Sequence, residues 1–268
     1  MTNKKYFIFI ISFLIIFSVL FPISVIFEWA FSEKWYGTSL FPEKWGIKWF
    51  KVLLKGGDLG KAMFLSFTIA PLVVLFSALI SIPAAYVVGT KNFKGKRLIE
   101  NLVLVPLIVP PIASGIGLLS MYTRWGLIGN YWGVVLVHMI GGIPYMFRSV
   151  TAAFESIDPS LEEASRTLGA TRLKTILKIY VPLVSPGILA GSIFTFAWSL
   201  NEFILTLLVG LPNITTLPVQ IFHYVGGYYI APAPASALSV ILIIPSIIMV
   251  LLLEKYIKVE YTAGAGLK

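Results

Sequence analysis

Residues 155–182 read ESIDPSLEEASRTLGATRLKTILKIYVP, a charged interval with long apolar stretches on either side. Asp158 and Pro159 are typical of a helix start, because aspartate can cap the first turn and proline suits its first position. Gly169 favours a helix end, since glycine adopts the left-handed C-terminal conformation most easily. A second short helix should follow and end at Pro182. The stretch therefore predicts a helix, a glycine turn and a second helix.

Both predicted helices are amphipathic. In the first, apolar or small residues recur at a spacing of three to four, and in the second an apolar face opposes a basic one. The apolar or small positions are Leu161, Ala164, Ser165 and Leu168 in the first helix and Leu173, Ile176 and Leu177 in the second. Periodicity alone leaves three locations open for such helices: on lipid, beneath their own bundle, or in a groove of a partner protein.

Apolar stretches long enough to cross a membrane lie on both sides of this segment. A membrane-spanning helix needs about 20 residues, and six stretches of at least that length carry almost no charge. The expected spans are 7–29, 62–90, 100–123, 127–154, 183–209 and 235–257. The chain is therefore predicted to be an all-α membrane protein, a single domain over residues 1–268 with an external loop at 30–61.

The composition of the 268 residues supports this fold class. Only 12% are charged, 57% are hydrophobic and the mean hydropathy is +0.88, which leaves too little polar surface for a water-soluble protein. The net charge of +9 is not gathered on one face, so it does not indicate a nucleic-acid partner. Without cysteine the chain has no disulfide, thiolate metal site or thiol nucleophile, and its two isolated histidines cannot form a metal centre.

The distribution of lysine and arginine sets the expected orientation. If the six spans alternate across the membrane, 14 of the 21 basic residues lie on the side that holds both termini and residues 155–182. By the positive-inside rule that side is the cytoplasm, although residues 30–61 carry six lysines on the opposite side. The first apolar stretch is expected to remain as an anchor, because no small-residue cleavage site follows it.

Prolines and glycines mark two of the spans as irregular. Pro106, Pro110 and Pro111 lie within the third span, and the run Gly141–Pro144 lies within the fourth. Each proline removes a backbone hydrogen bond, so kinks are expected in both helices, with neighbouring groups or water satisfying the freed carbonyls. Residues 210–234 carry no charge and are expected to fold back at the membrane surface instead of forming an aqueous loop.

One carboxylate falls well inside a predicted span: Glu202, in the run WSLNEF at residues 198–203. An ionisable group in the membrane is costly and commonly faces a pathway inside the bundle, so Glu202 is a candidate contact of a cationic solute. Trp198, one helical turn away, could offer its ring to a cation, and Asn201 adjoins Glu202. A structural ion pair for Glu202 and ordinary packing for Trp198 stay open as alternatives. His138 is expected to be a hydrogen-bonded core residue.

The charged segment resembles a known signature. Glu163-Ala164-Ser165, three residues, Gly169, nine residues and Ile179-Tyr180-Val181-Pro182 follow the EAA motif of permease subunits of ATP-binding-cassette (ABC) importers, with serine for the second alanine and valine for leucine. The resemblance implies a type I importer transmembrane domain, in which residues 155–182 are the coupling helices that contact a cytoplasmic ATPase. It further implies that Glu163 makes an acidic contact with a basic residue of the ATPase, and that the small residues Ala164 and Ser165 allow the two proteins to approach closely. The implied coupling residues are Glu162, Glu163, Ala164, Ser165, Gly169 and Ala170.

Longer runs, at 89–119, 160–203 and 217–224, look like permeases of the spermidine/putrescine-type importers. This resemblance favours a polyamine as the solute, with organophosphonates, sugars, oxyanions, iron and thiamine as alternatives. It implies a prokaryotic inner-membrane complex of this chain with a homologous second permease subunit, as a heterodimer, and two ATPase subunits. An extracellular or periplasmic solute-binding protein would dock on the outer loops.

The sequence contains no phosphate-binding loop of the form GxxxxGK[ST], so ATP and magnesium are expected on the partner ATPase and no cofactor on this chain. An intramembrane enzyme would need a nucleophile with a base, or paired acids, within the spans, and only Glu202 and His138 are available there. A passive channel would not explain a two-armed segment at the motif spacing. The chain is therefore predicted to be a transport subunit and not an enzyme.

Overall fold

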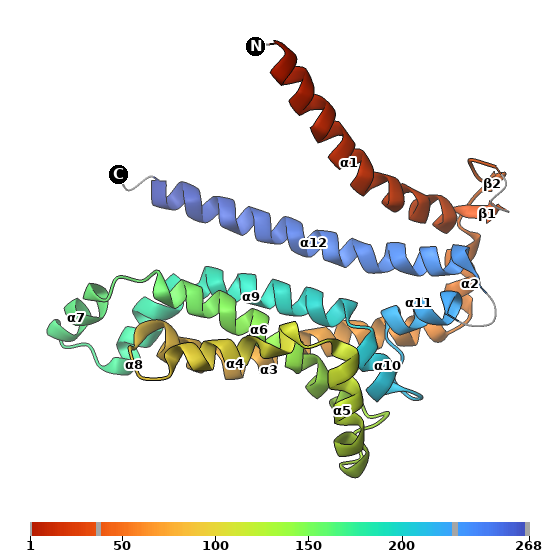
Figure 1. Cartoon of the computed structure of the whole chain (residues 1–268). Coiled ribbons are helices and arrows are strands. Elements are labelled where there is room, and N and C mark those ends of the chain that lie inside the picture. The colour runs from red at the N-terminus through yellow and green to blue at the C-terminus, as the bar shows by residue number, and fades with distance from the viewer. Residues whose placement is uncertain (1, 36–38, 227–229, 266–268) are drawn as a thin grey trace. The chain divides into compact units, whose positions relative to one another are not determined.

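A computed structural model describes residues 2–35, 39–226 and 230–265 of the chain, with side chains at 6–35, 39–226, 230–249, 251 and 252. Within these residues the regular elements are helices and one short antiparallel hairpin (Figure 1). The hairpin consists of β1 (Ser32–Lys34) and β2 (Lys44–Trp45). The helices are α1 (Thr2–Ala30), α2 (Lys48–Lys55), α3 (Asp58–Thr90), α4 (Lys96–Ile108), α5 (Pro111–Arg124), α6 (Tyr131–Glu155), α7 (Ser160–Thr167), α8 (Arg172–Thr175), the π-helical η1 (Ile176–Tyr180), α9 (Val181–Asn201), α10 (Ile204–Gly210), α11 (Leu217–Val225) and α12 (Pro232–Ala265).

Several of these helices are long and apolar enough to cross a membrane. Among the described residues there are five such stretches, and the pair α4–α5 makes a sixth if a bent pair counts as one span. The five are Tyr6–Ala30, Asp58–Thr90, Tyr131–Glu155, Arg172–Asn201 and Pro232–Met249. The predicted fold class, an all-α membrane protein, is confirmed.

The third apolar stretch is broken at its prolines. α4 ends at Ile108, α5 begins at Pro111, and the two helices are bent by 97° relative to each other. Val109 between them is extended, which is the conformation that a following proline favours. The two consecutive prolines supply no backbone N–H, so the helix cannot continue across them. The expected irregularity in this stretch is therefore a sharp break.

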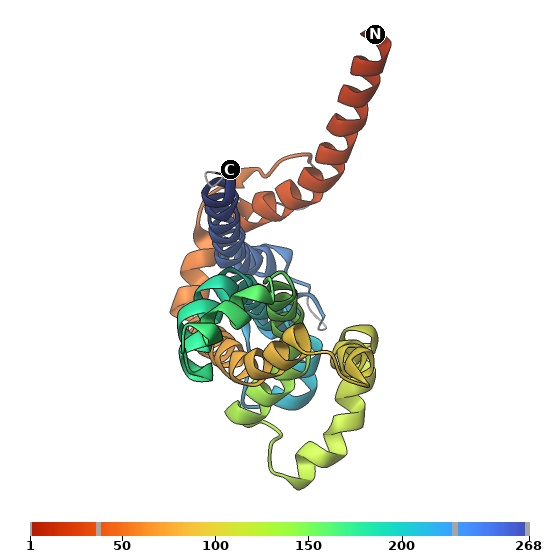
Figure 2. The same cartoon turned by 90° about the vertical axis from the view of Figure 1, so that its left-hand side faces the viewer.

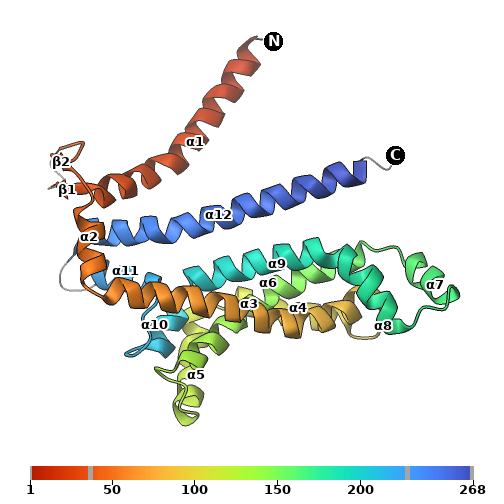
Figure 3. The ribbon, with the colours of Figure 1, turned by 180° about the vertical axis from the view of Figure 1, so that it is seen from behind.

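The chain divides into two compact units, of which unit 2 comprises residues 63–216 and 245–268. In unit 2, α6 and α9 lie side by side along most of their lengths (Figures 1 and 3). Apolar side chains of α3, α6 and α9, with one from η1, form a buried cluster at one end of this packing. Its members are Ala85, Val88, Met146, Phe147, Val150, Phe154, Tyr180 and Val184.

The proline in the fourth predicted span does not interrupt α6, which continues unbroken through Pro144. Hydroxyl groups of the neighbouring helices bond to carbonyls near it: Ser81 donates to Ile143 O and Thr195 donates to Gly142 O. Such side-chain donors satisfy backbone groups next to a proline in a membrane helix. Gly142 also lets α3, α6 and α9 approach closely, because a β-carbon there would lie 3.0 Å from atoms of three side chains.

The second arm of the charged segment was expected to end at Pro182, and this expectation is wrong. Residues Arg172–Asn201 form one continuous helical stretch. Immediately before Pro182 the backbone takes the π-helical turn η1, in which Val181 N–H bonds to Ile176 O, five residues back. The wider turn accommodates a proline that cannot donate to the carbonyl four residues before it. The second arm therefore leads directly into α9.

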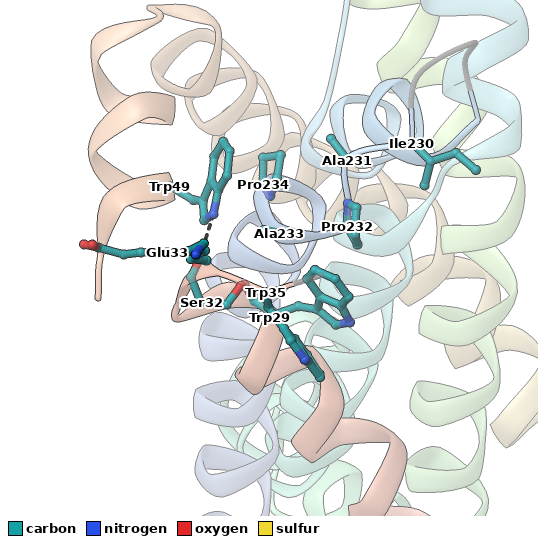
Figure 4. A pocket seen from close by; sticks show the side chains of 11 residues that line it. Trp29, Ser32, Glu33, Trp35, Trp49, Ile230, Ala231, Pro232, Ala233 and Pro234 are labelled. Atoms are coloured by element: carbon teal, nitrogen blue, oxygen red, sulfur yellow. Dashed lines mark hydrogen bonds between the residues drawn. The ribbon is translucent and has the colours of Figure 1, made fainter. Parts of the chain in front are cut away.

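Unit 1 comprises residues 1–62 and 217–244. The expected loop at 30–61 contains the hairpin and α2, and the uncharged residues 210–234 include the partly buried α11. A pocket of about 290 Å³ is lined by three tryptophans of the hairpin region and by residues at the start of α12 (Figure 4). Trp29 and Trp35 have ring centroids 4.3 Å apart, and Trp49 Nε1 donates to Ser32 O. The carboxylate of Glu33 points away from Trp29 and Trp35 (Figure 4).

Candidate functional site

The charged segment forms the two arms that the sequence predicts, at one end of unit 2 (Figures 1 and 3). Figure 2 is viewed from that end. Asp158 Oδ1 accepts from Ser160 N–H at 2.9 Å and caps α7, and this hydrogen bond lowers the pKa of Asp158. Gly169 follows α7 with a φ of +78° and open space where a β-carbon would lie. Thr171 then caps α8 by accepting from Lys174 N–H. The predicted cap, the left-handed glycine and the helix–turn–helix are confirmed.

Several residues of the two arms, leucines among them, are exposed. Glu163 and Ala164 of α7 are exposed, and Leu168 beside Gly169 is 87% exposed. The neighbouring apolar side chains that are also exposed are Leu161, Leu173 and Leu177. Exposed leucines on the two arms, with the acid Glu163 among them, are typical of a surface that contacts another protein. We call these exposed residues the α7–α8 face.

Ser165 of α7, in contrast, is buried. Its hydroxyl is 2.8 Å from the hydroxyl of Thr175 on α8, which is buried as well. The contact ties the two arms together across the Gly169 turn. The serine that replaces the second alanine of the motif therefore has a hydrogen-bonding partner inside the chain.

Glu162 differs from its neighbour Glu163 in its surroundings. Its side chain is only 15% exposed, and its Oε2 lies 3.2 Å from Lys91 Nζ and accepts a 2.9 Å hydrogen bond from Tyr180 Oη. Arg166 Nε lies 3.8 Å from the other oxygen. Burial raises the pKa of Glu162, but the hydrogen bonds from Tyr180 and Lys91 outweigh it, so that the pKa is lowered. We call Lys91, Glu162 and Tyr180 the Glu162 cluster.

Glu202 lies at a break between two helices and not within a continuous fifth span. α9 ends at Asn201 and α10 begins at Ile204. The side chain of Glu202 is buried, with the residue 6% exposed, and Oε1 accepts from Leu205 N–H at 2.7 Å. A carboxylate in this position satisfies a free N–H group in the first turn of α10. The structure thus gives Glu202 a capping role in the described chain.

His138 is completely buried beside this break. Its Nδ1 is 2.8 Å from Ser199 Oγ and its Nε2 is 2.6 Å from Thr206 Oγ1, so both ring nitrogens have partners. The predicted hydrogen-bonded core histidine is confirmed, and it connects α6 to α9 and α10. In the part of the chain that the structure describes, no group of three or more His, Cys, Asp or Glu residues could hold a metal ion.

Trp198 packs against α6. Its Nε1 donates to His138 O at 3.3 Å, and its ring centroid lies 5.8 Å from that of Tyr145, which in turn lies 6.4 Å from that of Phe194. Asn201 is exposed and bonds to Ala197 O on its own helix. The sequence reasoning missed the row of aromatic rings. The spacing of Phe194 and Trp198 by four residues was a signal for part of it, whereas Tyr145 joins only through the tertiary structure.

Comparison with known proteins identifies relatives of this chain. The family model described as "Binding-protein-dependent transport system inner membrane component" matches residues 81–258, which include both arms and the spans around them. The molybdenum transport system permease protein ModB of Escherichia coli K12 is 34% identical over 178 residues, covering 60% of this chain and 78% of the relative. The spermidine/putrescine transport system permease protein PotC of the same strain is 26% identical over 230 residues, covering 86% of each.

Solved structures share the fold. A chain of a bacterial ABC transporter involved in the import of the acidic polysaccharide alginate superposes with a TM-score of 0.72 at 21% identity, covering 92% of this chain and 94% of that one. A chain of the MetNI methionine ABC transporter, in an inward-facing conformation, gives a TM-score of 0.61 at 19% identity, covering 75% and 95%.

Proposed function

Because the chain belongs to the family of binding-protein-dependent transport system inner membrane components, and is thus a multi-pass permease subunit of a bacterial ABC importer, we propose that residues 155–182 couple it to a cytoplasmic ATPase. The observation that carries this proposal is the α7–α8 face, which leaves Leu168 and Glu163 exposed at one end of unit 2. Burial of that face against a partner would remove apolar surface from water.

The coupling residues have distinct roles in this proposal. Glu163 is the acidic contact to a basic ATPase residue, and the short side chain of Ala164 allows the two proteins to approach closely. Gly169 makes the turn that presents both arms, with Ala170 next to it. Ser165 ties the two arms together through Thr175.

The assembly proposed for this chain contains a homologous second permease subunit, two ATPase subunits that bind ATP and magnesium, and an external solute-binding protein. The solved alginate transporter in complex with an alginate pentasaccharide-bound periplasmic protein, similar to this chain with a TM-score of 0.73, supports such an arrangement. Both termini and the α7–α8 face are then cytoplasmic, and the tryptophan pocket of unit 1 is external. That pocket is a candidate contact for the binding protein.

A polyamine is the first candidate solute. The alignment with the spermidine/putrescine permease extends over 86% of both chains, and an aromatic row that can face a cation contains Trp198 and Tyr145. Molybdate is the second candidate, and the higher identity of the molybdenum permease favours it. Uptake of labelled spermidine and of molybdate by cells that express the whole importer separates the two. Uptake of molybdate and not of spermidine would contradict the polyamine proposal.

The variant Glu202→Gln tests whether the charge of Glu202 matters for a cationic solute. The amide oxygen can still accept from Leu205 N–H, so the cap on α10 is kept while the charge is removed. We expect spermidine uptake to fall about tenfold, the effect of ~1.4 kcal/mol, with unchanged amounts of assembled importer.

Glu202→Ala is the matched control, because it removes the cap as well as the charge. It should lower the thermal stability of the purified chain, which Glu202→Gln should not do. Unchanged spermidine uptake by Glu202→Gln would remove this carboxylate from the pathway and leave it the capping role alone.

A further inference from the structure

The Glu162 cluster joins three separate parts of unit 2. Glu162 belongs to α7, Lys91 directly follows the last residue of α3, and Tyr180 is the last residue of η1, where the second arm leads into α9. Lys91 is fixed to α3 because its N–H bonds to Val87 O at 3.0 Å, as in a further turn of the helix. One carboxylate therefore connects α7 to the ends of two predicted membrane spans.

Tyr180 is held firmly by its surroundings. The residue is 3% exposed, and its ring centroid lies 5.6 Å from that of Tyr86 on α3 and 5.9 Å from that of Phe154 on α6. A hydroxyl on a packed ring has little freedom, so its hydrogen bond to Glu162 costs little further ordering. This distinguishes the cluster from an ion pair between two mobile surface side chains, which usually contributes little.

The same contacts separate Glu162 from the α7–α8 face. Its oxygens already accept from Tyr180 and Lys91 and lie near Arg166, and the side chain is mostly covered. Glu163, the next residue, is exposed and free to meet a partner. The sequence predicted that Glu162 and Glu163 both contact the ATPase, whereas their surroundings in the structure indicate different roles.

We propose that Glu162 is a positioning residue: the Glu162 cluster holds α7 against the ends of α3 and α9, so that a displacement of the α7–α8 face moves both spans with it. The proposal rests on the proposed function, because it explains how a motion of the ATPase reaches the membrane helices. Glu163 contacts the ATPase, and Glu162 transmits the motion inside this chain.

The first experiment measures how firmly α7 is held. Because the chain has no cysteine, spin labels can be placed at Thr167→Cys on α7 and Lys94→Cys after α3 in the full chain, reconstituted in nanodiscs of Escherichia coli lipid. Pulsed electron paramagnetic resonance then gives the distance distribution between the labels. We expect a narrow distribution in the otherwise unaltered chain and one about twofold broader in Glu162→Gln and in Tyr180→Phe.

Two further variants show whether the cluster itself is responsible. Tyr86→Phe is the matched control, because the Tyr86 hydroxyl is buried and has no hydrogen-bond partner among the described residues. Its distribution should stay narrow. The exchanged pair Lys91→Glu with Glu162→Lys restores the opposite charges and a donor to Tyr180 Oη, and it should narrow the distribution again. Distance distributions of equal width in the unaltered chain, Glu162→Gln and Tyr180→Phe would overturn the proposal. A distribution for the exchanged pair that is as broad as that of Glu162→Gln would also overturn it.

The second experiment tests transmission in the assembled importer. With whichever probe the unaltered importer carries, spermidine or molybdate, Glu162→Gln should lower uptake about tenfold while ATP hydrolysis and the amount of co-purified ATPase stay within about twofold. Loss of the ATPase from Glu162→Gln would make Glu162 a docking contact and overturn the inference. Failure of the unaltered chain to bind any ATPase would instead contradict the proposed function, while the distance measurement would still report on the cluster.

Discussion

A chain that carries Gly169→Pro is expected to lose its ATPase subunits during purification and to lose at least about tenfold in uptake. Gly169 has a φ of +78°, and proline holds this angle near −65°. The substitution therefore changes the direction of the second arm relative to α7. It displaces the exposed residues of the second arm from those of the first. Co-purification of the ATPase with the tagged chain measures the effect.

Gly169→Asn is the matched control, since asparagine tolerates the left-handed region and a β-carbon at this position meets no other atom within 4 Å. It should retain the ATPase. Gly169→Ala should retain an amount of ATPase between those of Gly169→Pro and Gly169→Asn, because an alanine in the left-handed conformation costs about 1 kcal/mol. If Gly169→Pro leaves both assembly and uptake intact, the segment is not the coupling element.

The second large effect is expected from Gly142→Leu, which should destabilise the chain by about 3 kcal/mol. A β-carbon at Gly142 would lie 3.0 Å from Ser77 Oγ, Thr195 Cγ2 and Val73 Cγ1, so α3 and α9 must both move away from α6. The same movement would break the hydrogen bond from Thr195 to Gly142 O. Thermal unfolding of the purified chain in detergent measures the loss.

Gly117→Leu on α5 is the control for this substitution. A β-carbon there meets no atom within 4 Å, so the change should keep the stability within about 1 kcal/mol of the unaltered chain. Equal losses of stability in Gly142→Leu and Gly117→Leu would show that the packing of α6 does not depend on the close approach at Gly142.

Sequence patterns predicted most of the helices because their causes are local. The length of the apolar stretches gave the candidate spans, and the consecutive Pro110 and Pro111 marked the third stretch as irregular, although a kink was expected and a sharp break was found. Asp158 and Gly169 act through their own backbone and immediate neighbours, so their cap and turn could be read directly. Local chemistry sufficed in each case.

Two features of α9 could not be read in this way. Pro182 was expected to end a helix, but the π-helical turn before it changes the hydrogen-bond register and lets the helix continue. The sequence around the break at Glu202 contains no proline or glycine from which the break could have been predicted. Bonds from His138 to Ser199 and Thr206 surround the break, and these residues are more than 60 positions away from His138 in the sequence.

The different surroundings of neighbouring residues in the charged segment also could not be predicted from the sequence. The spacing of three to four placed Ser165 on one face with Leu161 and Leu168, yet Ser165 is buried against Thr175 while both leucines are exposed. Adjacent glutamates look equivalent in a motif. The positions of Lys91, directly after α3, and of Tyr180, in η1, distinguish Glu162 from Glu163.

The central claim, that the α7–α8 face contacts an ATPase, is tested most directly by site-specific photo-crosslinking in cells that express the whole importer. A photoreactive amino acid at Leu168, 87% exposed, is predicted to capture the ATPase subunit. The same photoreactive amino acid at Leu40, which is 80% exposed and lies on the outer side in the proposed orientation, is predicted not to capture it. Absence of a crosslink from position 168, or equal capture from both positions, would contradict the account.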